Sequence, residues 1–146
     1  MSRLFSSSVV VLALAGISLA QSAAENTLPL SFHAPFAFYA GNMQFAAGDY
    51  TVTMDSRVGV THVRGTGGSG VVWTVADSRP GAIQGHPSLT FNKYGEDKYF
   101  LEKFDDGRGL SEVTVPKSKT EREIVSARVV ASGGGPGKIR VLASVR

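Results

Sequence analysis

The chain of 146 residues contains no cysteine. Disulfide bonds, thiol catalysis, zinc sites built on cysteine and cysteine-bound iron–sulfur clusters are therefore excluded. A lipid anchor attached to a cysteine is excluded for the same reason. We expect the stability of this protein to come from a buried core and from backbone hydrogen bonds alone.

Charge is scarce at the start of the chain, where Arg3 is the only charged side chain before Glu25. Between them, residues 9–19 are apolar apart from small residues. This run suits the hydrophobic region of an export signal and is shorter than the roughly 20 residues that cross a bilayer. Small residues precede the bond after Ala20, so we predict a cleavable signal over residues 1–20. Cleavage a few residues later and an uncleaved membrane anchor are the alternatives.

Long apolar runs are absent after the signal, so no transmembrane anchor is expected once it is removed. Residues 21–146 suit a single domain by length. The net charge of +3 is too small to predict a nucleic-acid partner, which requires clustered basic residues. Hydropathy leaves a membrane barrel open as an alternative, because its strands merely alternate. We expect an exported protein, periplasmic or extracellular.

Aromatic and β-branched residues form short runs between Gly, Asp, Asn and Pro, which is typical of antiparallel β structure. We predict strands over residues 28–33, 36–40, 50–54, 58–64, 71–75, 89–94, 98–104 and 111–115. The run 71–75 is the most apolar and is expected to be the most buried, and the glycine-rich residues 65–70 are expected to form a flexible loop. The predicted fold class is mainly β, either an antiparallel β-sandwich or a small β-barrel.

Alternation in the predicted strand 98–104 places Tyr99 and Leu101 on one face and Phe100 and Phe104 on the other. Charged residues become frequent after this strand. Ser118 with Glu121 three positions later matches a capping box, so we predict one helix over residues 118–128. The β domain is expected to span residues 21–132. Residues 133–146 are expected to be a glycine-rich linker followed by a last strand or a tail.

No group of residues predicts catalysis, a metal site or a cofactor. The string G-x-G-x-x-G occurs at residues 65–70, but a strand pattern follows it where a dinucleotide site needs a helix. His33, His62 and His86 form neither an HxH nor an HExxH motif, and no G-x-S-x-G occurs. The ligand-binding candidates are the aromatic residues Trp73, Tyr94 and Tyr99, for which stacking on a sugar and filling of the core are the two alternatives.

Three blocks of turn glycines, aromatic residues and helix-start residues follow one another between residues 34 and 123. The first contains Pro35, Phe36, Phe38, Gly48 and Tyr50; the second contains Phe91, Tyr94, Gly95 and Phe100; the third contains Glu121 and Arg122. Together they resemble the pattern of small secreted proteins of unknown function that are abundant in Acidobacteria. The resemblance implies export and a shared β fold, and no activity. Ala46-Ala47-Gly48 departs from the proline-containing turn of that pattern.

The first functional hypothesis is a non-enzymatic domain of the bacterial envelope or extracellular space that binds or assembles. Its predicted contact is an N-terminal edge strand, residues 28–38 kinked at Pro35, which would pair with a second copy or another envelope component. The alternative is a barrel that binds a small apolar or carbohydrate ligand. A metal-dependent or hydrolytic enzyme is the second alternative.

Overall fold

The computed structural model describes residues 29–55, 58–77, 85–107, 112–131 and 135–145. The predicted signal and its cleavage site lie outside these residues, as does most of the predicted loop 78–87. In chain order the elements are β1 (Leu30–Ala34), β2 (Phe38–Ala40), β3 (Met43–Phe45), β4 (Gly48–Asp55), β5 (Val60–Gly65), β6 (Gly68–Trp73), β7 (Val75–Asp77), β8 (Ser88–Tyr94), β9 (Lys98–Asp105), β10 (Glu112–Thr114), α1 (Lys119–Ala131) and β11 (Gly137–Val145).

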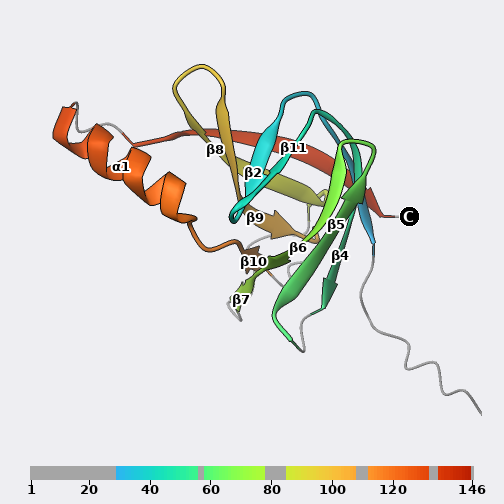
Figure 1. Ribbon diagram of the computed structural model, residues 1–146. Coiled ribbons are helices and arrows are strands. Elements are labelled where there is room, and N and C mark those ends of the chain that lie inside the picture. The colour runs from blue at the N-terminus through green and yellow to red at the C-terminus, as the bar shows by residue number, and fades with distance from the viewer. Residues whose placement is uncertain (1–28, 56–57, 78–84, 108–111, 132–134, 146) are drawn as a thin grey trace, which may run out of the picture.

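The strands form one sheet in the order β3-β2-β9-β8-β11-β1-β4-β5-β6, and β10 joins it by pairing with β7 and β9. The first and last strands of this path, β3 and β6, approach each other, so the sheet curves into a nearly closed barrel. Figure 1 shows the barrel with α1 standing to one side of it. The prediction of a mainly β fold with one helix in the C-terminal half is confirmed, and the sheet is barrel-shaped.

Aromatic rings fill the interior of the barrel. Phe38 stacks on Phe45 with ring centroids 5.1 Å apart, meets Phe91 edge-on at 5.4 Å and meets Tyr50 edge-on at 5.3 Å. Phe32 stacks on Tyr50 at 5.6 Å. All five rings are buried, which follows from the period-2 alternation of their strands. They occupy the space in which a ligand-binding barrel would hold its ligand.

The glycine-rich residues 65–70 form the β5–β6 hairpin, so the predicted flexible loop is wrong for most of this segment. The glycines are needed because side chains from other strands lie against their backbone. A Cβ on Gly67 would overlap the Tyr50 hydroxyl and the Ala46 carbonyl, and a Cβ on Gly70 would overlap the Met43 thioether. Close approach of neighbouring chains thus explains this glycine string without a nucleotide.

The predicted N-terminal edge strand is wrong, because β1 pairs with β4 on one side and with β11 on the other. Pro35 follows β1 directly and occupies a bend, where its missing N–H costs no ladder hydrogen bond. The ends of the sheet path are β3 and β6. A partner strand would therefore find no free edge on β1.

The prediction that residues 71–75, the most apolar run, form the most buried strand is also wrong. It divides into β6 and β7, and β6 pairs only with β5. Val72 faces the core and is 4 % exposed, whereas Val71 and Trp73 on the outer face are 51 % and 72 % exposed. Apolar character on both faces of a strand predicts burial on both sides, and here one side lacks a covering layer among the described residues.

A β-bulge changes which side chains of β9 point into the core. Thr90 pairs with Lys103 and Phe91 pairs with Leu101, so Glu102 is the extra residue. As a result Leu101 and Phe104, three positions apart, both belong to the core. The predicted alternation, which put Phe104 on the face of Phe100, is therefore wrong beyond Leu101.

The helix prediction is confirmed, with α1 extending a few residues beyond residue 128. The strand over residues 139–145, one of the two expectations for the chain end, is also present. It is β11, which pairs with both β8 and β1 and so lies inside the sheet. Residues 133–134 of the predicted linker lie outside the described residues.

Candidate functional site

A buried polar cluster connects α1 to the barrel. The Glu121 carboxylate, 3 % exposed, accepts hydrogen bonds from the Asn92 amide and the Tyr94 hydroxyl, each at 3.0 Å. Asn92 and Tyr94 belong to β8 and are also buried. A carboxylate removed from water requires such donors, since an unpaired buried charge is costly. The cluster therefore attaches the first turn of α1 to the outer side of β8.

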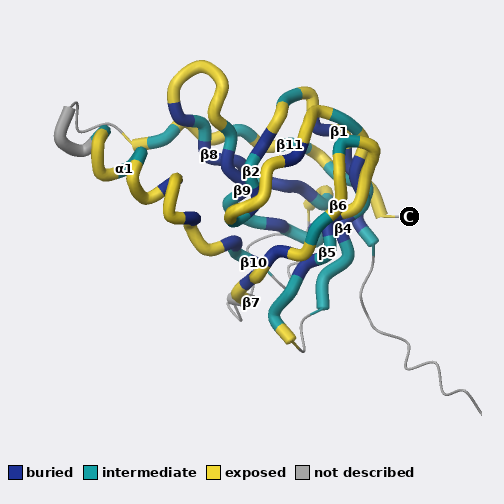
Figure 2. The backbone as a smooth tube through the Cα atoms, in the orientation of Figure 1, coloured by how far each residue is buried: buried dark blue, intermediate teal, exposed yellow. Residues whose placement is uncertain are grey.

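Ser118 caps the helix as predicted, because its hydroxyl accepts the N–H of Glu121 at 3.1 Å. The second half of a capping box would be the Glu121 side chain bonding back to the cap. That carboxylate turns to β8 instead. Figure 2 shows α1 buried at its beginning and more exposed beyond it, so the first turn makes the attachment.

Two cations border the cluster. The Lys138 ammonium on β11 donates to Oδ1 of the Asn92 side chain at 2.7 Å and also binds the Glu102 carboxylate. The Arg128 guanidinium lies 5.8 Å from the centre of the Tyr94 ring. Burial and the adjacent Glu121 carboxylate raise the pKa of Tyr94 well above its usual value. Tyr94 is thus a neutral donor at all physiological pH values.

Residues from two blocks of the family-like pattern meet in this cluster. Tyr94 comes from the second block, and Glu121 from the third. Phe100 packs edge-on against Tyr94 at 5.6 Å, and Gly95 takes a positive φ of 67° in the following turn. Arg122 lies on the exposed side of the helix and donates to the carbonyl of Lys117 at 3.1 Å. The contacts of Tyr94, Phe100 and Glu121 are thus internal to the fold.

The three aromatic ligand-binding candidates occupy different environments. Tyr94 is buried beneath α1, and Tyr99 stacks on Phe36 with ring centroids 3.9 Å apart. Trp73 is 72 % exposed on β6. Only Trp73 therefore presents most of its ring to solvent.

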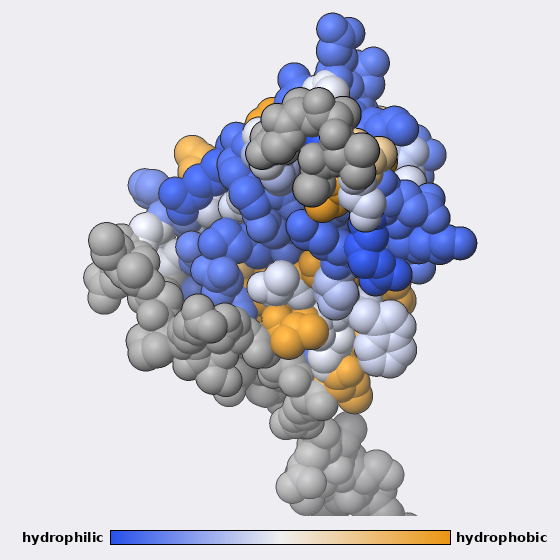
Figure 3. Space-filling view, turned by 90° about the vertical axis from the view of Figure 1, so that its left-hand side faces the viewer, coloured by the Kyte–Doolittle hydropathy of each residue, from blue (hydrophilic) through white to orange (hydrophobic). Residues whose placement is uncertain are grey.

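Trp73 is the middle residue of three exposed apolar residues at alternate positions along the chain. Val71 is 51 % exposed and Val75 is 59 % exposed, whereas the intervening Val72 and Thr74 are buried. We call Val71, Trp73 and Val75 the apolar row. The surface around α1 and the β8–β9 hairpin is predominantly hydrophilic, unlike the apolar row (Figure 3).

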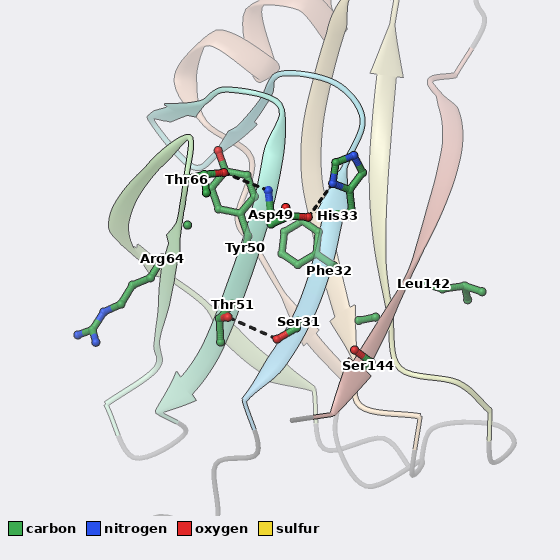
Figure 4. A pocket seen from close by; sticks show the side chains of 12 residues that line it. Ser31, Phe32, His33, Asp49, Tyr50, Thr51, Arg64, Thr66, Leu142 and Ser144 are labelled. Carbon is green, nitrogen blue, oxygen red and sulfur yellow. Dashed lines mark hydrogen bonds and ion pairs between the residues drawn. The ribbon is translucent and has the colours of Figure 1, made fainter.

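A shallow groove of about 820 Å³ crosses the outer surface of β5, β4, β1 and β11. Figure 4 shows Arg64 extending from one margin and Leu142 from the other. Between them lie the hydroxyls of Ser31, Thr51, Thr66 and Ser144. The lining thus combines these polar groups with apolar surface, and it includes Phe32 and Tyr50, two residues whose rings belong to the buried core.

His33 and Asp49 form a hydrogen-bonded pair in this groove, with Nδ1 and Oδ1 2.7 Å apart. Both side chains are largely exposed, at 66 % and 78 %, so the pair contributes little to stability. The nearby Ser31 hydroxyl pairs with Thr51 at 3.4 Å. Within the described residues this arrangement does not connect a serine to the histidine as a hydrolase would require.

The three histidines are not gathered into one site: His33 lies on β1, His62 lies on β5 opposite Thr53, and His86 precedes β8. No group of three or more His, Asp or Glu side chains with metal-binding geometry occurs among the described residues. None of the helices described is both long and apolar enough to cross a bilayer.

Comparison with protein-family models, with curated proteins and with solved structures found no match to this chain. Sequence reasoning identified Tyr94, Trp73 and the Ser118–Glu121 pair. It missed Asn92, Arg64 and the groove, because these depend on which strands become neighbours. The strand around Asn92 offered no distinctive signal, because Ser88, Thr90 and Lys93 of the same strand are also polar.

Proposed function

We propose that this chain is an exported, non-enzymatic β-barrel domain that acts by binding or assembly in the bacterial envelope or extracellular space. The observation that carries the proposal is the exposure of Trp73 and the rest of the apolar row. Contiguous exposed apolar side chains on a soluble domain commonly mark interaction surfaces. Tryptophan is also the residue type most enriched among residues that dominate binding energy.

The distribution of aromatic residues supports this reading. The core is built from phenylalanine and tyrosine rings, while the sole tryptophan of the chain lies outside it. Leaving so large a ring in water sacrifices the free energy of its burial. A binding partner that covers Trp73 would recover that free energy, so the exposed ring would favour binding.

Export is supported by the N-terminal sequence, in which one basic residue, an apolar run and small residues follow in signal-peptide order. The resemblance to small secreted proteins of Acidobacteria supports the same compartment. It extends the proposal to membership of that group, whose shared positions include Tyr94 and Glu121.

One experiment tests export and binding together. The full chain with a C-terminal epitope is expressed in a bacterium, and N-terminal sequencing of the exported form should begin near Gln21. The processed protein is then sedimented with isolated envelope fragments of that bacterium. Trp73→Ala should reduce co-sedimentation, whereas Val145→Ala, which alters an exposed apolar residue of β11 outside the groove, should not. Retention of the chain in the cytoplasm, or equal binding by both variants, would refute the proposal.

The groove supports a second candidate function, the binding of a carbohydrate on the outer surface. Its hydroxyls and the Arg64 guanidinium offer the donors and acceptors that sugars require. The interior, filled by rings, is a poorer location for a ligand than this groove. Titration with soluble cell-wall oligosaccharides, followed by NMR, should shift the amides of Ser31 and Thr51 if the groove binds sugar. Unchanged amides at millimolar sugar would eliminate this candidate.

A further inference from the structure

We infer that the groove across β5, β4, β1 and β11 binds an acidic saccharide, with the Arg64 guanidinium holding a carboxylate of one sugar unit. The inference rests on the second function proposed above, carbohydrate binding, and specifies its ligand. It depends on the order in which polar side chains cross the strands and on the guanidinium that stands among them.

A row of polar side chains crosses the strands along the groove. The strand register pairs its members successively, in the order Ser144, Ser31, Thr51 and Arg64. Paired residues of neighbouring strands point to the same face of a sheet, and Figure 4 shows these four side chains in one line on the outer surface. We call them the polar row. Neighbouring strands lie about 4.8 Å apart, so the row is roughly 14 Å long.

The polar row suits an extended saccharide chain. A sugar ring in such a chain is about as long as the spacing between strands, so successive rings can meet successive side chains of the row. The hydroxyls of Ser31 and Thr51 lie 3.4 Å apart and are partly buried, and each can donate and accept a hydrogen bond. Leu142, 65 % exposed at the groove margin, adds apolar surface against which the C–H groups of a sugar can pack. The groove therefore offers the mixture of contacts that a saccharide requires.

Arg64 indicates that the saccharide is acidic. Its guanidinium is exposed, and no carboxylate of the described residues forms an ion pair with it. Arginine presents its N–H groups as a planar fork that binds a carboxylate through two hydrogen bonds. A neutral sugar would leave this positive charge without an acid, whereas a uronic acid would supply one at the end of the polar row.

Asp49, an acid in the same groove, limits where the ligand carboxylate can lie. It stands two positions before Thr51 on β4, so its Cα lies roughly 7 Å along the strand from the polar row. Its Oδ1 atom is hydrogen-bonded to Nδ1 of His33 at 2.7 Å. A ligand carboxylate is therefore attracted to Arg64 and repelled from the side of Asp49. Substitutions of these two residues should change the affinity for an acidic ligand in opposite directions.

Two oligosaccharides that differ only in their acid groups test the inference. Oligomers of mannuronate and of mannose, with the same linkage and length, are titrated into the processed chain, and the amides of Ser31 and Thr51 are followed by NMR. The mannuronate oligomer should bind roughly 5-fold more tightly, which is the upper range for an exposed ion pair. Arg64→Gln should remove this preference without weakening the mannose oligomer, and Asp49→Asn should increase it.

Two further variants control for charge. Arg122→Gln makes the same change at an exposed arginine of α1, outside the groove, and should leave both affinities unchanged. Arg64→Lys keeps the charge but loses the planar fork, so it should retain only part of the preference. Circular dichroism verifies that each variant folds.

Equal binding of the two oligomers would overturn the inference and leave carbohydrate binding in place. Equal effects of Arg64→Gln and Arg122→Gln would also overturn it, because the preference would then reflect a general attraction to basic residues. If neither oligomer shifts the two amides at millimolar concentration, the inference fails, and the titration with cell-wall oligosaccharides decides separately whether carbohydrate binding stands.

Discussion

Replacing Glu121 by alanine is expected to detach the first turn of α1 from the barrel at a cost of about 2–4 kcal/mol. Among the described residues, the substitution removes the one acceptor for the Asn92 amide and the Tyr94 hydroxyl. Both donors are buried, at 1 % and 3 % exposure, so each would lose about 1–3 kcal/mol unless water replaced the carboxylate. Water entering the vacated space would offset part of this loss.

Two further terms are smaller. Alanine favours the helix over glutamate by a few tenths of a kcal/mol. A carboxylate in the first helical turn contributes about 0.3–1 kcal/mol through the helix dipole, which alanine loses. These terms nearly cancel, so the hydrogen bonds decide the outcome. The corresponding fall in Tm is roughly 6–16 °C for a chain of this size.

Urea unfolding followed by far-UV circular dichroism would measure the change. Trp73 emission suits this poorly, because the indole is already largely exposed in the folded state. Glu123→Ala is the matched control, since Glu123 lies on the same helix and its ion pair with Lys119 spans 3.9 Å at the surface. It should cost less than about 0.5 kcal/mol.

Glu121→Gln separates the hydrogen bonds from simple packing. Glutamine keeps the size of the side chain and an acceptor oxygen, so it should recover at least half of the stability lost in Glu121→Ala. If Glu121→Ala and Glu123→Ala differ by less than about 0.5 kcal/mol, the buried cluster does not hold the helix. Equal losses for Glu121→Gln and Glu121→Ala would assign the effect to packing instead.

Three other outcomes follow from the structure. The pKa of Tyr94 is higher in the folded than in the unfolded state, so the unfolded state releases this proton first as the pH rises. The free energy of unfolding should therefore be unaffected by this group below pH 10 and fall above it by up to about 1.4 kcal/mol per pH unit. Tyr94→Phe should remove this part of the fall in stability at alkaline pH, as measured by urea unfolding. Gly67→Ala should cost about 1–3 kcal/mol, because its Cβ meets the Tyr50 hydroxyl and a backbone carbonyl. Gly70→Ala should cost less, because its Cβ overlaps the flexible end of Met43 and meets the Phe45 ring only at 3.3 Å. Equal Tm values would contradict this. Trp73→Ala should change the Tm of dilute protein little, since the ring is mostly in water.

Local sequence patterns were sufficient for the elements that depend on neighbouring residues. Period-2 alternation predicted the strand around Tyr50, and Ser118 with Glu121 predicted the start of the helix. These features arise from side-chain direction and capping within a few positions. The same logic failed in β9, where the extra residue Glu102 reverses the alternation. A bulge is set by the partner strand, and no pattern within 98–104 indicates it.

Strand neighbours could not be predicted either. The chain end forms β11 between β8 and β1, which turns the N-terminal strand from a predicted edge into an interior strand. Such a pairing joins Leu30 to Val145, the two ends of the described chain. Many registers of two alternating strands have similar hydrophobic patterns, and tertiary packing selects among them. The exposure of each candidate residue depends on which strands become neighbours. The sequence could therefore indicate Trp73 as a ligand-binding candidate but could not predict that its side chain is exposed.

The two surfaces of the molecule differ in how their polar and apolar groups are used. On the side of α1, the buried acid Glu121 and its donors already satisfy one another, so a partner there would have to break existing hydrogen bonds. On the side of β6, covering Trp73 breaks no side-chain hydrogen bond to the part of the chain that the structure describes, and it removes apolar surface from water. Association at the second surface therefore begins with a smaller penalty. For this reason, we expect substitutions near α1 to change stability and substitutions in the apolar row to change association.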